Sequence, residues 1–342
     1  MARTRIPVIV VAGFLGSGKT TLLNHLLRQS GGTRIGVIVN DFGSINIDAM
    51  AVAGQVDAMV SLDNGCLCCA VDPGELDTMV HKLSRPQSAI DVIVIEASGL
   101  ADPRSIVKML ISSEEPGIRY GGFVEVVDAV EFDSTRSRHP EIDTQIDFAD
   151  VVLVNKIDRV DADSRASVLR TLGTITPGTP LLPTEHGRID PSFLFDEHAR
   201  STQPKVGEQL SLDDLCAHDE DDHEHLHTVY ETVTFTSESP MDPRSLMHFL
   251  DHRPAGLYRL KGNVYFGLAD HPEKFVLHTV GNYLRFHRRG WDSGETRTTS
   301  LVAIGAGLDT TDLTARLRDC VAPESSEHDE FSMLPILRFT DG

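Results

Sequence analysis

Residues 13–20, GFLGSGKT, constrain the fold of this chain more than any other stretch, because they match the pattern G-x-x-x-x-G-K-[ST]. An apolar run at 6–13 precedes them, and an amphipathic helical pattern at 20–29 follows. In such a strand–loop–helix context, glycines let backbone N–H groups point inward, and the helix N-terminus adds partial positive charge. The pattern predicts a phosphate-binding loop. The competing interpretation is a glycine-rich turn with no ligand.

Further apolar runs alternate with helical patterns over the first two hundred residues. Near-continuous β-branched runs of this length are typical of parallel strands buried on both faces. We therefore expect a doubly wound, mainly parallel α/β sheet over residues 1–202, with ligands at the carboxyl ends of its strands. The runs lie at 34–40, 91–99, 123–129, 150–158 and 180–184.

The composition changes near residue 203. Residues 203–227 are polar, acidic and rich in histidine, which indicates a linker or an exposed insertion. Alternating strand patterns and two amphipathic helices follow, so we expect a smaller, antiparallel α+β domain over 228–322. The remaining residues, 323–342, look like a loose tail. No internal repeat is visible.

Charge and hydropathy exclude several classes of partner. The 342 residues carry a formal net charge of −20, which disfavours nucleic acid and anionic membrane surfaces. No apolar stretch approaches the roughly 20 residues of a membrane span. The apolar N-terminus runs directly into the phosphate loop, so cleavage of a signal peptide would destroy that loop. An odd number of clustered cysteines fits a reducing compartment, and we expect a cytoplasmic protein.

The loop assigns roles to its own residues. Lys19 is expected to reach the β- and γ-phosphates, and the Thr20 hydroxyl to bind Mg²⁺. As a catalytic residue, Lys19 would stabilise charge during phosphoryl transfer. The complete set of expected nucleotide contacts here is Gly13, Gly16, Ser17, Gly18, Lys19, Thr20 and Thr21.

A second motif, NKID at 155–158, ends a later predicted strand of the same sheet. The carboxylate of Asp158 can accept hydrogen bonds from guanine N1–H and the guanine amino group, which adenine does not offer in that arrangement. Together with the upstream phosphate loop, it favours GTP over ATP. Without a ligand, the motif would be only a strand-ending turn.

Two acidic residues are candidates for a place near Mg²⁺. Glu96 ends the strand in VIVIEASG and could bind Mg²⁺ through water or position the attacking water. Asp41 ends the second predicted strand, in VNDFGS, and is the other candidate. Gly99 could sense the γ-phosphate. Alternatively, either carboxylate is a surface group at a strand end.

The stretch NGCLCC places Cys66, Cys68 and Cys69 in a loop that is bounded by glycine and proline. The spacing matches neither a closed zinc ribbon nor a thioredoxin-type motif. Three thiolates can converge on a soft or borderline ion, Zn²⁺ or Co²⁺, and leave its shell incomplete, which suits delivery. Buried inert thiols and a redox switch remain as alternatives. The cluster lies between the phosphate loop and Glu96, where segments respond to the γ-phosphate, so metal affinity and nucleotide affinity would be coupled.

Histidines in the acidic stretch could also hold a metal. They lie among seven acidic residues between 213 and 224, and a weak loading site and a solvated spacer are equally supported. The lone Cys216 and Cys320 are interpreted as structural. The candidate histidine ligands are His218, His223, His225 and His227.

The sequence resembles the CobW-type family of metal-handling GTPases over nearly its whole length. The matching pieces are GFLGSGKTTLLN, VNDFGSINID, NGCLCC, IEASGLADP, VVDA, NKID, RLKGNVYF and TSLVAIGAGLD, in this order. The resemblance implies a phosphate-loop GTPase that delivers a metal, most often zinc or cobalt, to a client protein. It assigns guanine contact to Asn155, Lys156 and Asp158, and metal to the three cysteines. One departure is Asp41, which stands where the family usually has glutamate.

We therefore expect a GTP-dependent metallochaperone that binds GTP, Mg²⁺ and Zn²⁺ or Co²⁺. Its client metalloprotein would dock on the C-terminal domain or on the thiol loop, and a homodimer could complete one metal site between two subunits. Alternatives are an activator of one metalloenzyme, of the nitrile hydratase type, and a metal buffer or sensor with incidental nucleotide turnover. An ATP-using kinase or a redox switch is disfavoured by Asp158 and by the thiol spacing.

Overall fold

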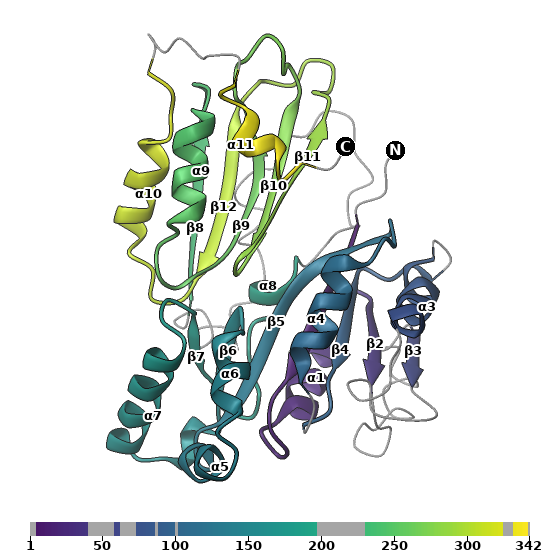
Figure 1. The fold of residues 1–342 in the computed structure, drawn as a ribbon, viewed down its shortest axis with the longest axis vertical. Coiled ribbons are helices and arrows are strands. Elements are labelled where there is room, and N and C mark those ends of the chain that lie inside the picture. Colours follow the sequence, from purple (N-terminus) through teal and green to yellow (C-terminus); the bar gives the residue numbers. More distant parts are fainter. Residues whose placement is uncertain are drawn as a thin grey trace. The chain divides into compact units, whose positions relative to one another are not determined.

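The computed structural model describes residues 5–39, 58–61, 73–85, 88–99, 102–196, 230–323 and 331–340. The described residues belong to two compact units (Figure 1). Unit 1 takes its residues from Met1–Thr176 and Leu182–Val229, and unit 2 from Pro177–Leu181 and Tyr230–Gly342. The expected boundaries at 202/203 and 227/228 lie outside the described residues, so they stay predictions.

Unit 1 is built on a seven-stranded sheet with the order β3-β2-β4-β1-β5-β6-β7. Neighbouring strands from β3 to β6 pair in parallel, and the residues of β2 and β6 are buried throughout. The predicted α/β fold class is confirmed. The strands are β1 (Ile6–Ala12), β2 (Ile35–Val39), β3 (Ala58–Ser61), β4 (Val92–Glu96), β5 (Ile118–Asp128), β6 (Val151–Asn155) and β7 (Leu181–Pro183).

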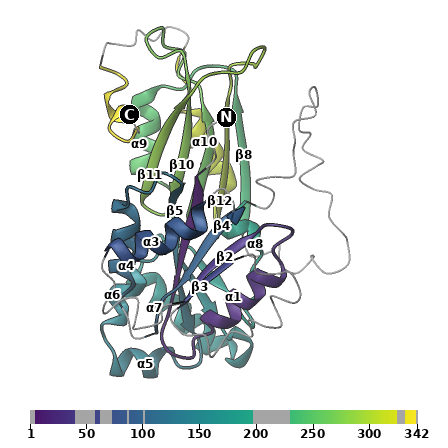
Figure 2. The same cartoon turned by 90° about the vertical axis from the view of Figure 1, so that its right-hand side faces the viewer.

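Helices cover both faces of this sheet. Figure 2 shows α1 (Lys19–Arg28) on one side and α3 (Pro73–Ser84) and α4 (Pro103–Ser112) on the other. The inner face of α1 consists of four leucines at helical spacing, all fully buried. Helix α4 begins at a proline behind the N-cap Asp102, whose carboxylate accepts the Arg104 N–H. The remaining helices are α5 (Phe132–Arg138), α6 (Ile142–Asp147), α7 (Ala162–Ile175), α8 (Pro191–Leu194) and the short 3₁₀-helix Ile157–Arg159.

Unit 2 is a five-stranded antiparallel sheet with the order β11-β10-β9-β12-β8. Alternation along β8 puts Val233 and Phe235 into the core and the intervening threonines outside. The sequence therefore forms the expected α+β unit. Its elements are β8 (Glu231–Ser237), α9 (Pro243–Asp251), β9 (Leu257–Val264), β10 (Lys274–Val280), β11 (Tyr283–Arg289), β12 (Thr299–Gly305), α10 (Thr310–Arg318) and α11 (Leu334–Leu337).

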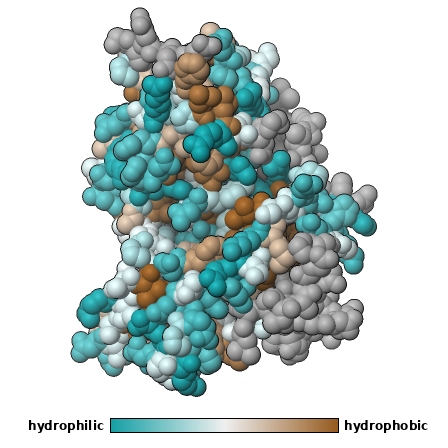
Figure 3. All heavy atoms as spheres, in the orientation of Figure 1, coloured by the Kyte–Doolittle hydropathy of each residue, from teal (hydrophilic) through white to brown (hydrophobic). Residues whose placement is uncertain are grey.

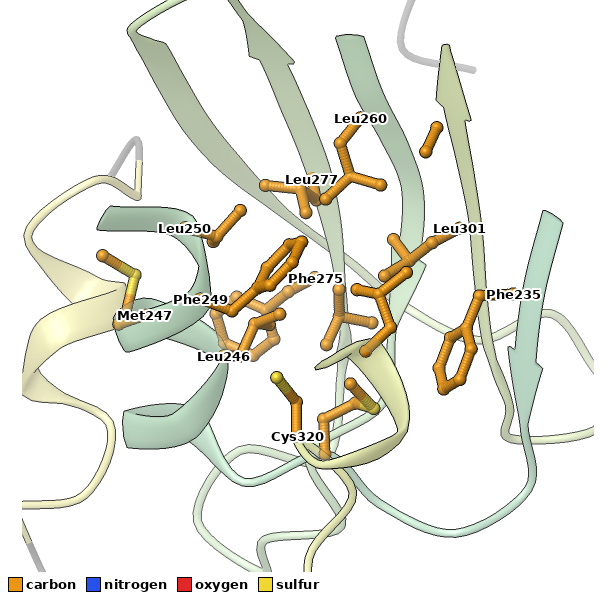
Figure 4. Packing of buried hydrophobic residues seen from close by; sticks show 14 of the residues in the cluster. Phe235, Leu246, Met247, Phe249, Leu250, Leu260, Phe275, Leu277, Leu301 and Cys320 are labelled. Atoms are coloured by element: carbon orange, nitrogen blue, oxygen red, sulfur yellow. The ribbon is translucent and has the colours of Figure 1, made fainter. Parts of the chain in front are cut away.

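The core of unit 2 is apolar (Figure 4). Leu250 and Phe249 of α9 point toward Leu277 and Phe275 of β10. The Phe275 ring also makes edge-to-face contacts with the rings of Phe266 and Phe286. Cys320 belongs to this cluster as well. Its Sγ lies 3.2 Å from the Arg316 carbonyl oxygen, and burial raises its pKa to about 11, so the thiol is inert packing as expected.

The structure differs from the expected elements in three places. The prediction lacked the short edge strand β3, and it started β5 five residues late, because a Gly-Gly pair at 121–122 looked like a boundary. A Cβ on Gly121 would come within 3.0 Å of Pro7 and Ile9, so glycine serves there for close strand packing. The expected loose tail is wrong for 331–340, because Met333 and Ile336 are buried in the core of unit 2.

The described surface is mostly polar. In the face drawn in Figure 3, hydrophilic residues dominate and apolar ones form small separate areas. Among the described helices, none combines the length and hydropathy needed to cross a membrane.

Candidate functional site at the phosphate loop

The loop between β1 and α1 depends on glycine at defined positions. Gly16 and Gly18 have φ of 78° and 110°, in the left-handed region that side chains rarely adopt. A Cβ on Gly13 would lie 2.3 Å from the Val126 carbonyl oxygen, so the loop can rest directly on β5 only with glycine there. The pattern of the motif thus follows from backbone geometry, and its N–H groups lie at the start of α1.

Lys19 is almost buried, with 8% of its surface exposed. Its Nζ donates to the carbonyl oxygens of Gly13, at 2.8 Å, and Phe14, at 3.3 Å. Burial lowers the pKa of Lys19, while the charges of Glu96 and Glu125 oppose this shift. A buried ammonium held by neutral carbonyls can exchange them for a phosphate oxygen, which carries more negative charge.

Thr20 and Glu96 meet at the carboxyl end of β4. The Thr20 hydroxyl donates to Glu96 Oε1 over 3.0 Å, although the two residues are far apart in sequence. A hydroxyl and a carboxylate, both hard oxygen donors beside a phosphate loop, fit Mg²⁺. Close by, Ser17 is buried, and its Oγ has no hydrogen-bond partner among the described residues.

Asn155 braces the loop from the end of β6. Its Nδ2 donates to the Ser17 carbonyl oxygen and its Oδ1 accepts the Gly187 N–H, both at 2.9 Å. A Cβ on Gly18 would meet Asn155 Nδ2 at 2.1 Å, so glycine is required for this approach. The Cα of Gly187 lies against the backbone of Leu22 in α1, so that a Cβ there would come within 2.8 Å of the Leu22 N. One amide therefore ties together β6, the phosphate loop and the segment after β7.

Lys156 makes a second tie. Its Nζ donates to the Gly16 carbonyl oxygen at 2.7 Å and to Asp128 Oδ2 at 2.6 Å. Asp158 follows in the short 3₁₀-helix, with 28% of its side chain exposed and Arg159 Nε 4.0 Å away. Asn155 and Lys156 of the NKID motif thus contact the phosphate loop, while Asp158 presents a partly exposed carboxylate.

Gly99 lies against the other side of the loop. A Cβ there would come within 2.9 Å of the Leu15 N and 3.1 Å of its side chain. The segment that follows Glu96 at the end of β4 is therefore in direct contact with the phosphate loop. Thr21, in contrast, is exposed on α1.

Several predicted site residues lie outside the described residues. Within the parts of the chain that the structure describes, no group of three or more His, Cys, Asp and Glu side chains forms a metal site. The predicted residues outside are Asp41, Cys66, Cys68, Cys69, His218, His223, His225 and His227.

Sequence reasoning missed three residues at this site. Asp128 and Gly187 hold Lys156 and Asn155 in place, and Glu125 lies buried on β5 beneath the loop. Two signals were available: a glutamate inside the apolar run FVEVVDA, and a glycine after the last strand of the sheet. The pairing of Gly187 with Asn155, however, is visible only in three dimensions.

Comparison with protein families gives two matches. Residues 7–183 match the model of the CobW/HypB/UreG nucleotide-binding domain. Residues 230–321 match the cobalamin synthesis protein CobW C-terminal domain. The first match contains every described site residue except Gly187.

Individual relatives agree with these matches. The zinc chaperone CobW of Sinorhizobium sp is 29% identical over 88% of this chain and 93% of its own length. The zinc-regulated GTPase metalloprotein activator 1 of Schizosaccharomyces pombe is 31% identical over 54% of this chain and 47% of its own length. A solved Zn(II)-bound structure of the YjiA GTPase from E. coli aligns over 94% of this chain and 100% of its own, with 22% identity and a TM-score of 0.47.

Proposed function

Because the chain belongs to the CobW/HypB/UreG family of nucleotide-binding proteins and carries a CobW C-terminal domain, we propose that it is a GTP-hydrolysing metallochaperone. Its cargo would be a transition metal, zinc before cobalt, delivered to a client metalloprotein in the cytoplasm. The names of the relatives, a zinc chaperone and a zinc-regulated GTPase metalloprotein activator, support this proposal.

The convergence of Lys19, Thr20 and Glu96 is the observation that carries the GTPase part. On binding, Lys19 would exchange the Gly13 and Phe14 carbonyl oxygens for phosphate oxygens and stabilise the charge that develops there. The Thr20 hydroxyl and the Glu96 carboxylate would hold Mg²⁺, which supplies charge neutralisation between the phosphates. Glu96, and Asp41 from outside the described residues, would orient the attacking water.

The guanine part rests on the NKID motif. Asp158 would accept the N1–H and amino protons of guanine, while Asn155 and Lys156 keep the base loop attached to the phosphate loop. Gly99, which packs closely against Leu15 of the loop, would respond to the γ-phosphate.

Base selectivity tests this assignment through Asp158→Ala. We expect wild type to prefer GTP over ATP and the variant to lose roughly 10- to 100-fold of that preference, because hydrogen bonds to a charged acceptor contribute about 1.5–3 kcal/mol. The measurement is competitive displacement of a fluorescent GDP. Asp163→Ala, an exposed carboxylate in the first turn of α7, is the matched control. An unchanged preference in the Asp158 variant would remove the guanine assignment.

Metal delivery rests on the three cysteines of the thiol loop, with the metal as substrate. Cys66, Cys68 and Cys69 would hold Zn²⁺ or Co²⁺ as thiolates in one nucleotide state and release it in the other. The C-terminal unit or the thiol loop would receive the client, and a homodimer could complete the metal shell. His218, His223, His225 and His227 would serve as a weak loading site.

A zinc titration distinguishes this function from its alternatives. Reduced protein is titrated against a competing chelator with a Mg²⁺–GTP analogue and then with Mg²⁺–GDP. The chaperone predicts a difference of about 10-fold or more, equal to about 1.4 kcal/mol of coupling, which disappears when the three cysteines become serine.

Equal zinc affinity in both nucleotide states, repeated with Co²⁺, would favour the metal buffer or sensor. A switch that operates with only one client enzyme would favour an activator of the nitrile hydratase type. Replacing the four histidines by glutamine should remove only a second, weaker class of sites.

A further inference from the structure

Glu125 is a buried acid in the wall of the phosphate site. It lies on β5, where its Cα pairs with Ala12 of β1 and Val152 of β6, directly beside the start of the loop. Only 3% of its surface is exposed, and its Oε2 has no hydrogen-bond partner among the described residues. Placing a carboxyl group there is costly unless it is neutral or compensated, so its position calls for an explanation.

A pocket connects Glu125 with the loop itself. Phe14, Leu15 and Ser17 line it from the loop, and Phe132 and further residues of α5 and α6 line the opposite side. Ser17 Oγ, which also lacks a partner in the described part of the chain, opens on the same pocket. Two buried polar groups thus lie behind the backbone that would hold the phosphates.

Burial and charge act in opposite directions on the pKa of Glu125, and burial has the larger effect. Among the described residues, Lys19 of α1 is the cation whose charge acts on Glu125, and that ammonium is already bound by loop carbonyls. The other titratable groups of the pocket, Asp128 and Glu131, are acids. His139, the C-cap of α5, contacts Phe14 of the loop with tilted rings, 4.8 Å between their centroids.

Burial raises the pKa of Glu125 to about 8, against the opposing effect of Lys19. A bound nucleotide would add negative charge to the same loop and draw Lys19 toward the phosphates. Both changes stabilise the protonated acid further.

We propose that Glu125 is a positioning residue of the phosphate loop that takes up a proton when a nucleotide binds, so that nucleotide affinity falls as the pH rises. The proposal rests on the proposed function, since it requires that the loop binds a nucleotide. In the neutral state the acid places no second negative charge behind the phosphates, and its O–H can donate within the pocket.

The direction in which nucleotide affinity changes with pH follows from the two protonation states of Glu125. Below a pH of about 8, Glu125 is neutral with or without nucleotide, and affinity does not depend on it. Above that value the free protein carries the carboxylate, and binding must first restore the proton. Between pH 7.0 and 8.5 the dissociation constant of the Mg²⁺–GDP complex should therefore rise about fourfold, with uptake of roughly 0.7 proton at pH 8.5.

Isothermal titration calorimetry with Mg²⁺–GDP tests this inference on the full chain. The same titrations, run in buffers of different ionisation enthalpy, give the number of protons taken up. Glu125→Gln keeps the shape of the side chain without the titration, so its affinity should stay constant over this pH range and its proton uptake should vanish. Glu114→Gln, an exposed acid that does not line the pocket, should behave like wild type.

Three results are decisive. If wild type and Glu125→Gln share one pH profile, the inference is wrong. If neither binds GDP at any pH, the proposed function fails instead. Should Glu125→Gln not fold, infrared spectra of wild type decide: the band of a neutral carboxylic acid must grow on addition of GDP at pH 8.5, and an unchanged band would overturn the inference.

Discussion

Lys19 and Lys274 are both buried lysines, one in each unit, but they have different partners. Lys274 is 5% exposed, pairs with the Glu295 carboxylate at 2.7 Å, and lies over the ring of Trp291. In the part of the chain that the structure describes, the hydrogen-bond partners of Lys19 are the carbonyl oxygens of Gly13 and Phe14. An ammonium paired with a carboxylate already has its charge compensated, whereas one that faces carbonyl oxygens remains able to bind an anion. Burial alone therefore does not identify a functional cation, but the charge of its partners does.

The comparison extends to the surroundings of these lysines. In unit 2 the Thr279 and Thr299 hydroxyls accept backbone N–H groups of neighbouring strands, and aromatic and aliphatic side chains fill the core. In unit 1 polar side chains gather beneath one loop, and Glu125 and Ser17 each keep an atom without a partner in the described structure. Four variants test this contrast between a unit built for stability and a unit built for chemistry.

The largest effect is expected from Phe275→Ala in the core of unit 2. Removing a fully buried ring should lower the free energy of unfolding by about 3–5 kcal/mol. Trp291 is the only tryptophan of the chain, so its fluorescence in urea reports on this unit. Phe331→Ala, at a 60% exposed position, is the control. GTP hydrolysis without urea should persist, and its loss would show that the chemistry depends on unit 2.

Lys19→Met should lower the rate of GTP hydrolysis and leave stability unchanged. Hydrolysis of GTP should fall about 10²- to 10³-fold, equal to about 2.7–4 kcal/mol, because the charge beside the phosphates is lost. The free energy of unfolding without nucleotide should change little, since in the described structure Lys19 donates its hydrogen bonds to carbonyl oxygens rather than to a carboxylate. Lys108→Met, exposed on α4, should change neither quantity. A strongly destabilised Lys19→Met protein would contradict the assignment.

Lys274→Met tests the structural lysine. It leaves Glu295 without its partner, so unfolding followed by Trp291 should become easier by about 1–3 kcal/mol. The rate of GTP hydrolysis should equal that of wild type. If instead the rate falls while stability is retained, the distinction between the two lysines is wrong.

Acid–base linkage at Glu125 gives the smallest effect. The folded protein without nucleotide holds a proton up to a pH of about 8, whereas the unfolded chain releases it near 4.5. The folded state therefore binds more protons in this window, and stability falls as the pH rises through it. Wild type should lose a few degrees of melting temperature relative to Glu125→Gln between pH 7 and 8, where the linkage amounts to about 1 kcal/mol, measured by circular dichroism. A constant difference would mean that Glu125 is already ionised.

Local sequence patterns predicted much of the fold and the core of the site. The β-branched runs and the loop glycines report local backbone geometry, so β1, β6 and the phosphate loop could be read directly. The sequence assigned Thr20 and Glu96 separately to Mg²⁺, and the structure joins the two side chains by a hydrogen bond, while their role at the metal stays a prediction. The sequence did not predict β3, because four residues carry little periodicity. It did not predict α11 either, because the burial of that helix depends on a sheet distant in sequence.

The remaining gaps concern side-chain partners. Nothing in the sequence indicates that the Asn155 amide reaches both Ser17 and Gly187, because those contacts join separate strand ends. The raised pKa of Glu125 likewise depends on which groups surround it after folding. The predictions for Cys66, Cys68, Cys69 and the histidines lie outside the described residues and await the metal titration.

The brace at Asn155 also bears on the kinetics of the cycle. Two hydrogen bonds at 2.9 Å hold the loop in shape before any ligand arrives, so its ordering entropy is lost during folding rather than at each encounter. Such preorganisation favours rapid capture of the nucleotide. Exchange of GDP for GTP therefore need not wait for this loop to refold. The slow step that sets the rate of the nucleotide cycle must lie in another part of the molecule.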